Sequence, residues 1–233
     1  MRRSEINQII QESLDFLRSR HFPLPPFAFW TPGQWLQAGP ECSAIVAESL
    51  GWDITDFGSG DFRKTGLFLF TLRNGTLDTT LAKDNGKVYA EKIMIVDEGQ
   101  VTPTHYHAFK SEDIINRGGG VLCVRLWNAS DCGKLAGTEV EVYVDSILHR
   151  LPAGSTIRLE PGSSVCLTPR LYHTFWGEEG KGRLLVGEVS RVNDDATDNY
   201  FLDPVGRFPA VEEDVAPLHL LCSDYAKFTR FKA

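Results

Sequence analysis

The stretch that decides the fold runs Gly99-Gln-Val-Thr-Pro-Thr-His105-Tyr-His107-Ala-Phe-Lys110-Ser-Glu112. Residues two apart on a β-strand point to the same side, so His105 and His107 project from one face, ~7 Å apart at Cα. Two imidazoles at that spacing can bind one metal ion. Glu112 follows beyond a predicted turn and can return on the neighbouring strand to add a carboxylate oxygen. The stretch therefore predicts a metal site on a strand.

A fourth ligand has to come from elsewhere in the chain, and His173 is the candidate. It follows Pro169-Arg-Leu-Tyr and begins a predicted strand that continues into Thr174-Phe175-Trp176. A His-x-His pair alone is more often an ordinary half-exposed pair than a metal site. The leading glycine, the glutamate and the later histidine together favour a site made by His105, His107, Glu112 and His173.

Outward from this stretch, the chain is typical of an all-β protein. From about residue 60 it consists of short runs rich in Val, Ile, Leu, Tyr and Thr, separated by Gly, Pro or Asp. Asn74-Gly75 predicts a tight hairpin, because both positions must take positive φ. Many short strands indicate a sandwich, jelly roll or barrel. The predicted strands are 66–72, 87–96, 102–107, 112–116, 121–127, 138–144, 156–160, 164–168, 173–176 and 183–189.

The two ends of the chain differ from this middle part. Residues 4–20 predict a helix with Ser4 as N-cap, and a second short helix is predicted over Ala44–Leu50. The tail after 190 is polar, and its acidic run Glu212-Glu213-Asp214 favours a solvated loop. We therefore expect three parts: an N-terminal helical arm packing on the barrel (1–59), the barrel with the metal site (60–190) and a C-terminal extension (191–233). Helical spacing gives the first helix an apolar face made by Ile6, Ile9, Ile10, Leu14 and Leu17.

Composition excludes some classes of partner. The 233 residues carry a formal charge of −7 without a basic run, whereas nucleic acids and anionic membranes need clustered Lys and Arg. The five cysteines are odd in number and lack CxxC spacing, so free thiols are expected rather than a disulfide framework. Met1-Arg2-Arg3 is not followed by an apolar segment, which favours a cytoplasmic protein.

The motif residues resemble the cupin superfamily. Its first motif is matched by Gly99, His105, His107, Glu112 and Gly119 at the usual spacings, and its second only in part, by Gly162, Pro169 and His173, with Trp176 where asparagine is usual. The match covers about residues 60–190. The resemblance implies an all-β fold, a cupin-type β-barrel (jelly roll), here with an N-terminal helical extension.

A longer resemblance, to the D-lyxose isomerase family of cupins, covers most of the chain. It implies a manganese-dependent aldose–ketose isomerase acting on free sugars, D-lyxose to D-xylulose and D-mannose to D-fructose. Co, Ni, Fe and Zn are the alternative metals, and a homodimer is the common cupin outcome, which the apolar face of the first helix could support. The resemblance rests on 51–62, on Lys110 inside the metal motif, on Glu188-Val-Ser190, on 192–195 with Asp198-Asn199, and on Gly206-Arg-Phe-Pro209.

Isomerisation also needs groups that move a proton. Lys110, three residues after His107, can reach a substrate oxygen or shuttle a proton; without the resemblance, a surface lysine would be the better interpretation. Glu188 lies in an apolar strand, where a carboxylate either has a raised pKa, as a general base needs, or pairs with an arginine. Asp195, Asp198 and Arg207 are candidates for closing over the sugar, against the simpler interpretation of a polar loop.

Two other functions share this metal site. Oxygen-using cupins and non-enzymatic cupins that bind small ligands use three histidines and one glutamate too, but a paired acid and base favour proton transfer. A phosphosugar isomerase would need clustered Arg or Lys for the phosphate, and the sequence has no such cluster.

Overall fold

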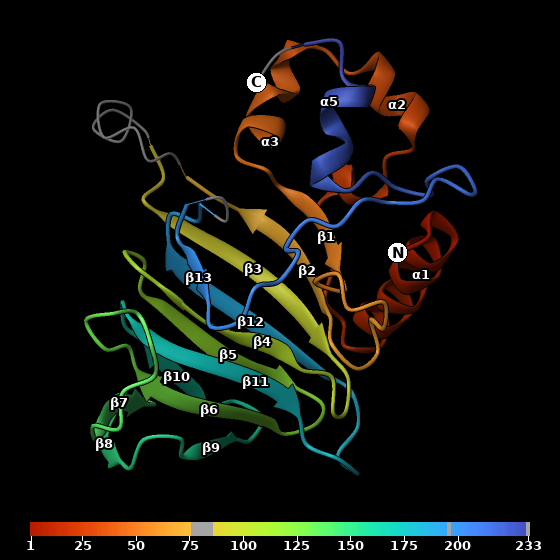
Figure 1. Cartoon of the computed structure of the whole chain (residues 1–233). Coiled ribbons are helices and arrows are strands. Elements are labelled where there is room, and N and C mark those ends of the chain that lie inside the picture. Colours follow the sequence, from red (N-terminus) through yellow and green to blue (C-terminus); the bar gives the residue numbers. More distant parts are fainter. Residues whose placement is uncertain (76–85, 195–196, 232–233) are drawn as a thin grey trace.

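Two antiparallel sheets face each other as a barrel in the computed structural model, which describes residues 1–75, 86–194 and 197–231 (Figure 1). One sheet has eight strands in the order β1-β2-β3-β12-β5-β10-β7-β8 and the other has five in the order β13-β4-β11-β6-β9. The prediction of an all-β protein with an N-terminal helix is confirmed.

Each sheet combines strands that are distant in the sequence. The eight-stranded sheet contains β1 (Gly51–Thr55), β2 (Leu67–Arg73), β3 (Tyr89–Val96), β5 (Glu112–Gly118), β7 (Val140–Val144), β8 (Ile147–Leu151), β10 (Ser164–Leu167) and β12 (Leu184–Arg191). The five-stranded sheet contains β4 (Thr102–His107), β6 (Leu122–Asn128), β9 (Thr156–Leu159), β11 (Leu171–Gly177) and β13 (Asn199–Phe201). The sheets thus use strands from outside residues 60–190 at both ends, and the division into three parts stays a prediction.

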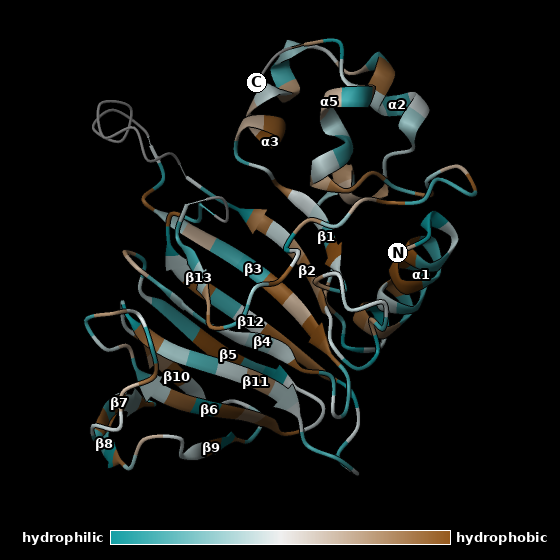
Figure 2. Cartoon of the chain, viewed as in Figure 1, coloured by the Kyte–Doolittle hydropathy of each residue, from teal (hydrophilic) through white to brown (hydrophobic). Residues whose placement is uncertain are grey.

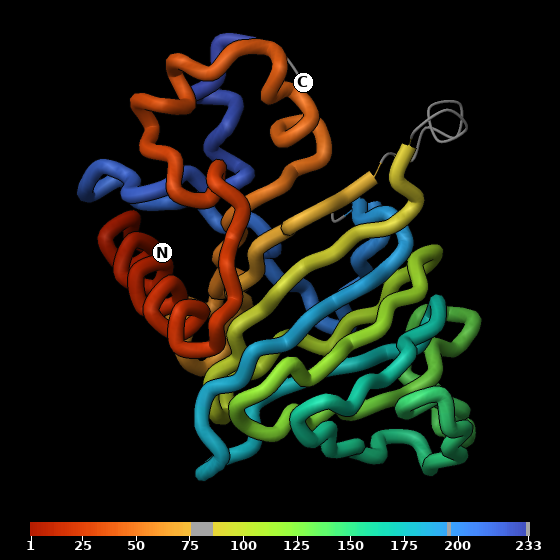
Figure 3. The backbone as a smooth tube through the Cα atoms, turned by 180° about the vertical axis from the view of Figure 1, so that it is seen from behind, coloured from red at the N-terminus to blue at the C-terminus, as the bar shows by residue number. Residues whose placement is uncertain are grey.

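Alternation along the strands of the larger sheet creates two cores. On β2, Leu69 faces the barrel interior, whereas Phe68 and Phe70 face outward against α1 (Arg3–Ser19). The apolar face of α1 is buried there, as its spacing predicts, and Figure 2 shows these apolar residues on the side of the helix that faces the sheet. Seen from behind, α1 lies beside the β1–β3 end of the sheet (Figure 3). Because that face is covered by the protein's own sheet, it is not available to support a dimer.

A small helical cap joins the two ends of the chain at one end of the barrel (Figure 1). Its core is Trp35, Leu220 and Tyr225, and the Tyr225 hydroxyl donates to the Leu50 carbonyl at 2.7 Å. The second predicted helix is present but shorter. The cap consists of η1 (Pro26–Phe29), α2 (Pro32–Gln37), η2 (Pro40–Cys42), α3 (Ser43–Ala47), η3 (Cys222–Asp224) and α5 (Tyr225–Phe228).

The tight turn predicted at Asn74-Gly75 was wrong. Neither Asn74 nor Gly75 has a positive φ, whereas Asp145 (49°) and Ser146 (65°) do, and these two form the tight turn between β7 and β8. The link between β2 and β3 continues into 76–85, which lie outside the described residues. Asn74 instead uses its side chain to hold other parts of the chain, a role that turn statistics do not reveal.

The expected N-cap was also wrong, whereas the acidic run 212–214 is an exposed loop, as predicted. Arg2 occupies the N-cap position, and the Ser4 hydroxyl donates to Asp214 at 2.6 Å. The buried Arg3 guanidinium binds Glu213 at 2.7 Å and Asp224 at 3.0 Å. One carboxylate of this exposed loop, that of Glu213, therefore also neutralises a buried cation at the start of α1.

All five cysteines are free thiols, as their spacing predicts, with Cys123 buried and Cys166 half-buried. Within the described ranges, no helix has the length and apolar character needed to cross a membrane.

Candidate active site

The candidate site lies between the two sheets, and each sheet supplies a different set of side chains. His105 and His107 on β4 and His173 on β11 form what we call the histidine wall, from the five-stranded sheet. His105 and His173 are directly opposite in the β4–β11 register. Lys92 on β3, Glu112 on β5 and Glu188 on β12 form the charged wall, from the eight-stranded sheet.

Glu112 reaches the histidines from the facing sheet. The sequence predicted its return on a strand neighbouring β4, and this was wrong because the chain crosses from one sheet to the other in the turn between β4 and β5. The Glu112 carboxylate lies 3.3 Å from Nε2 of His107 and 3.4 Å from Nε2 of His173. The ligand atoms of the three histidines lie within 4.8 Å of one another. The structure thus brings all four predicted ligands together.

The orientation of the rings suits a bound cation. Nδ1 of His105 donates to the Pro103 carbonyl at 2.8 Å and Nδ1 of His173 donates to the Leu171 carbonyl at 3.1 Å, so each Nε2 keeps its lone pair. Nδ1 of His107 is buried without a hydrogen-bond partner in the part of the chain that is described. Three imidazoles and one carboxylate, without a thiolate, are a donor set that fits a divalent metal ion.

Burial keeps His105 and His173 neutral. It lowers the pKa of His105 well below its usual range, helped by the charges of His173 and His107, and it lowers the pKa of His173 to about 4. Neutral imidazole is the form that binds metal. For Glu112, burial raises the pKa, but the Lys110 ammonium and His107 outweigh it and hold the pKa well below its usual range. The carboxylate is therefore ionised.

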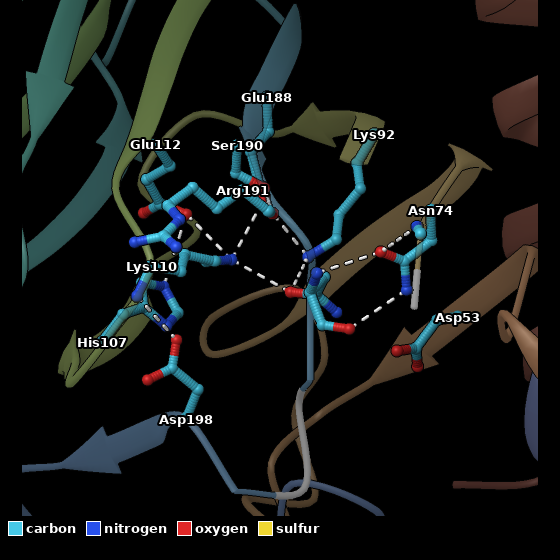
Figure 4. Close-up of polar contacts among 12 residues, drawn as sticks. Asp53, Asn74, Lys92, His107, Lys110, Glu112, Glu188, Ser190, Arg191 and Asp198 are labelled. Atoms are coloured by element: carbon cyan, nitrogen blue, oxygen red, sulfur yellow. Dashed lines mark hydrogen bonds and ion pairs between the residues drawn. The ribbon is translucent and has the colours of Figure 1, made fainter. Parts of the chain in front are cut away.

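Lys110 and Glu188 meet beside the ligands, as Figure 4 shows. Nζ of Lys110, from the turn between β4 and β5, lies 3.0 Å from Glu188 and 3.0 Å from Glu112. The sequence left a raised pKa or an arginine partner open for Glu188, and neither is found. Burial raises the pKa of Glu188, but the charges of Lys110 and Lys92 together outweigh burial, so the pKa lies below its usual value.

Lys92 is a site residue that the sequence interpretation missed. It is buried, and its Nζ lies 3.2 Å from Glu188, its register partner across β3 and β12. A signal was present, because Lys92 shares the inward face of its strand with Met94 and Val96, just as Glu188 follows Leu184 and Val186. A lysine and a glutamate in such positions on two buried strands can pair, but only the strand register shows that they do.

The two predicted substrate-binding residues make protein contacts. The buried Asp198 carboxylate accepts from the backbone N–H groups of Phe109 at 2.8 Å and Lys110 at 3.1 Å, so it holds the turn that carries Lys110 (Figure 4). Arg207 lines the pocket and pairs with Asp53 on β1. The third candidate, Asp195, lies outside the described residues.

A pocket of about 460 Å³, counting its open mouth, is lined by the groups of both walls. The lining combines the polar groups of the two walls with apolar side chains. The apolar lining is made by Phe57, Leu67, Leu69, Met94, Ile114, Phe175 and Phe201.

Comparisons with known proteins agree on one family. The sequence profile described as D-lyxose isomerase matches residues 1–225. A protein of Serratia proteamaculans named D-lyxose/D-mannose isomerase is 51% identical over 98% of this chain and 99% of its own length. A protein of Escherichia coli O157:H7 with the same name is 47% identical over 98% of this chain and all of its own.

Solved structures similar to this chain confirm the cupin-type barrel. The L-ribose isomerase of Cellulomonas parahominis, solved with L-psicose, has a TM-score of 0.59 at 18% identity and covers 91% of this chain and 98% of its own. The L-ribose isomerase of Acinetobacter sp. DL28, in complex with L-ribose, has a TM-score of 0.58 at 17% identity with the same coverage. At these identities the likeness shows the fold alone.

Proposed function

The chain belongs to the D-lyxose isomerase family and is a sugar aldose–ketose isomerase, and from this premise we propose that it interconverts D-lyxose and D-xylulose, and D-mannose and D-fructose, as free sugars. The observation that supports this most strongly is the buried Lys110–Glu188 pair, in which Nζ of Lys110 also lies 3.0 Å from the carboxylate of Glu112. Moving a proton between C1 and C2 of an open-chain sugar needs such a pair beside a centre that stabilises charge on oxygen.

The metal we propose is Mn²⁺, held by His105, His107, Glu112 and His173, with Co, Ni, Fe and Zn as alternatives. A bound divalent ion supplies positive charge that stabilises negative charge developing on the sugar oxygens. Nitrogen and oxygen ligands without sulfur support this range of metals, among which availability decides.

Glu188 and Lys110 divide the proton transfer between them in this proposal. Glu188 is ionised at neutral pH, since its pKa is lowered, so it can accept the proton that leaves carbon. Lys110 presents an ammonium hydrogen to the sugar oxygen that gains negative charge. The proton then returns from Glu188 to the adjacent carbon, while the hydroxyl that becomes the new carbonyl gives its proton back to Lys110, which completes the exchange of aldose and ketose through a cis-enediol.

Asp198 and Arg207 complete the proposed site. The Asp198 carboxylate was predicted to bind sugar, and its two backbone hydrogen bonds support a role in placing Lys110. Arg207, fixed by Asp53, can donate to sugar hydroxyls at the pocket wall. The buried acid–base pair speaks against an oxygenase or a cupin that only binds a ligand.

The test is isomerisation by protein stripped of metal and reloaded. Reloading with Mn²⁺ is expected to restore conversion of D-lyxose and D-mannose, under air and under strict anaerobiosis alike. In D₂O the product is expected to carry deuterium at C1 or C2 in one stereochemical sense. The proposal fails if no free pentose or hexose is converted with any of the five metals, or if turnover consumes oxygen in proportion to product.

We also propose that the enzyme is a cytoplasmic homodimer. Twofold dimers are the commonest oligomers and the usual outcome for cupins, and an exposed free thiol at Cys132 suits a reducing compartment. Light scattering is expected to give twice the 26.0 kDa chain mass. A single-chain mass at micromolar concentration would rule the dimer out.

A further inference from the structure

Asn193 lies two residues after β12 and contacts both buried lysines. Its side-chain Oδ1 accepts from Nζ of Lys92 at 2.6 Å and from Nζ of Lys110 at 3.0 Å. The same two ammonium groups lie 3.2 Å and 3.0 Å from Oε1 of Glu188. The two ammonium groups therefore alternate with two oxygens, Oδ1 of Asn193 and Oε1 of Glu188, around a closed ring of polar contacts. Figure 4 shows Lys92 and Lys110 approaching Glu188 from opposite sides.

The main chain of Asn193 is itself held in place by Asn74. Oδ1 of Asn74 accepts from the Asn193 N–H at 2.9 Å, and Nδ2 of Asn74 donates to the Asn193 carbonyl at 3.0 Å. The same Nδ2 donates to the Glu48 carbonyl at 3.2 Å. Asn74 is buried, so these bonds are protected from water. The position of the Asn193 main chain is thus set independently of the side-chain contacts with the lysines.

A neutral acceptor suits the charges around it. Lys92 and Lys110 carry two positive charges, and Glu112 and Glu188 carry two negative ones, all buried. An ammonium has three hydrogens to place, and a buried donor left without an acceptor costs free energy. The amide oxygen of Asn193 takes one hydrogen from each lysine without adding a third negative charge that burial would penalise.

Without that acceptor, Lys110 has a competing partner. Glu112 lies 3.0 Å from its Nζ, the same distance as Glu188. The amide oxygen lies on the Glu188 side, where it also holds Lys92. Removing it leaves the Lys110 ammonium free to move toward Glu112, away from the carboxylate with which it shares the proton transfer.

We propose that Asn193 is a positioning residue: its amide oxygen holds the ammonium groups of Lys110 and Lys92 against Glu188 in the geometry that proton transfer requires. The mechanistic part rests on the proposed function, whereas the hydrogen-bonded arrangement does not. Lys92 acts in the same arrangement by holding Glu188 from the side opposite Lys110.

The kinetic test compares Asn193→Leu with Asn193→Asp. The leucine variant removes the acceptor at similar volume and keeps the backbone bonds to Asn74, so kcat is expected to fall on the order of 10²-fold, the cost of a misplacement of about 1 Å. KM is expected to stay within about twofold and metal content to stay stoichiometric. The reason is that the Asn193 amide bonds to the two lysines and to no metal ligand, and that Asn193 does not line the pocket. The aspartate variant restores an oxygen acceptor and is expected to regain at least about tenfold of that loss.

Asn128→Leu is the matched control, since the Asn128 amide bonds Thr138 and Glu139 and no site residue. It is expected to keep the wild-type kcat. A leucine variant at position 193 with at least half the wild-type kcat would overturn the proposal, and so would equal kcat values for its leucine and aspartate variants.

A second measurement does not depend on turnover. In ¹H–¹⁵N spectra of lysine ammonium groups, assigned with Lys92→Met and Lys110→Met, both buried groups are expected to give signals protected from exchange with water. Asn193→Leu is expected to shift or remove both signals, and Asn128→Leu neither. If the wild type converts no free sugar, the proposed function fails while these signals still decide the arrangement. Two unchanged signals in Asn193→Leu would overturn it.

Discussion

The histidine wall and the charged wall face each other across one pocket, yet they handle burial in opposite ways. On the histidine wall, burial removes charge from His105 and His173, because it lowers the pKa of His105 and brings that of His173 to about 4. On the charged wall, burial is tolerated with charge retained, because Glu188 is paired with Lys92 and Lys110. Under the proposed function this difference separates two tasks: neutral nitrogens bind a cation, and paired charges move a proton.

Lys110 belongs to neither sheet and connects the two walls. It lies in the turn by which the chain crosses from β4 to β5, and it contacts Glu112 on one side and Glu188 on the other. A one-residue shift in that turn would separate the acid–base pair while leaving the histidines in place. Variants that disrupt one wall, or the link between the walls, therefore test whether the other wall keeps its function.

The largest effect is expected when the histidine wall is broken. Replacing His105 or His173 with alanine removes one of four ligands, so stoichiometric metal is expected to be lost. Activity is expected to fall on the order of 10³-fold or more, since a bound ion supplies several kcal/mol of charge stabilisation. Elemental analysis and initial rates measure the two losses. His149→Ala, which changes an exposed histidine on β8, is expected to keep both its metal and its activity. Full metal content in His105→Ala would disprove the ligand set.

Disrupting the Lys110–Glu188 pair is expected to spare the metal. Lys110→Met and Glu188→Gln are expected to lower kcat on the order of 10²-fold, the usual worth of a positioned acid or base. Metal content is expected to stay at the wild-type level, and Lys134→Met, at an exposed position, serves as the matched control. Loss of the base is expected to stop exchange of the C2 proton with D₂O, whereas loss of the oxygen-side donor leaves some exchange. Near wild-type rates in both variants would end this assignment.

Releasing the link between the walls is expected to have a smaller effect. Asp198→Ala removes the carboxylate that accepts from the N–H groups of Phe109 and Lys110. A fall in kcat of about tenfold is expected, because a less well-placed group transfers protons more slowly, with KM nearly unchanged. Asp198→Asn keeps one acceptor oxygen, so its kcat is expected to lie between those of the wild type and Asp198→Ala. Asp203→Ala, at an exposed site, is the control. A raised KM with an unchanged kcat would instead show that Asp198 binds sugar.

The smallest effect expected is on the acid stability of the metal-free protein. The pKa of His173 is about 4 when folded and roughly 6.5 when unfolded, so the unfolded state binds more protons between these values. Stability therefore falls as pH drops from 7 toward 4, by about 2 kcal/mol at pH 5 from this residue. Denaturant unfolding at pH 7 and pH 5 is expected to show a smaller loss in His173→Gln. Equal losses in wild type and variant would contradict the neutral histidine wall, and His149→Gln is expected to match the wild type.

Much of the site could be predicted because its residues obey local rules. His105 and His107 share a face through the two-residue period of a strand, and Glu188 follows Leu184 and Val186 on an inward face. The ends of the chain could not be predicted in this way. Arg3 is neutralised by Glu213, which is 210 residues away, and the polar segment after β12 contains Asn193, whose contacts with Lys92 and Lys110 give no local pattern.

By itself the sequence determined which residue types could bind a metal, that they would sit on strands, and that the family is one of sugar isomerases. Only the tertiary structure decided that Glu112 approaches from the facing sheet, that Lys92 pairs with Glu188 through the β3–β12 register, and that Asp198 holds the turn of Lys110. The physical reason is the range of the interactions. Strand alternation is set by neighbouring residues, whereas pairing between distant strands depends on register, and register depends on how the whole barrel packs.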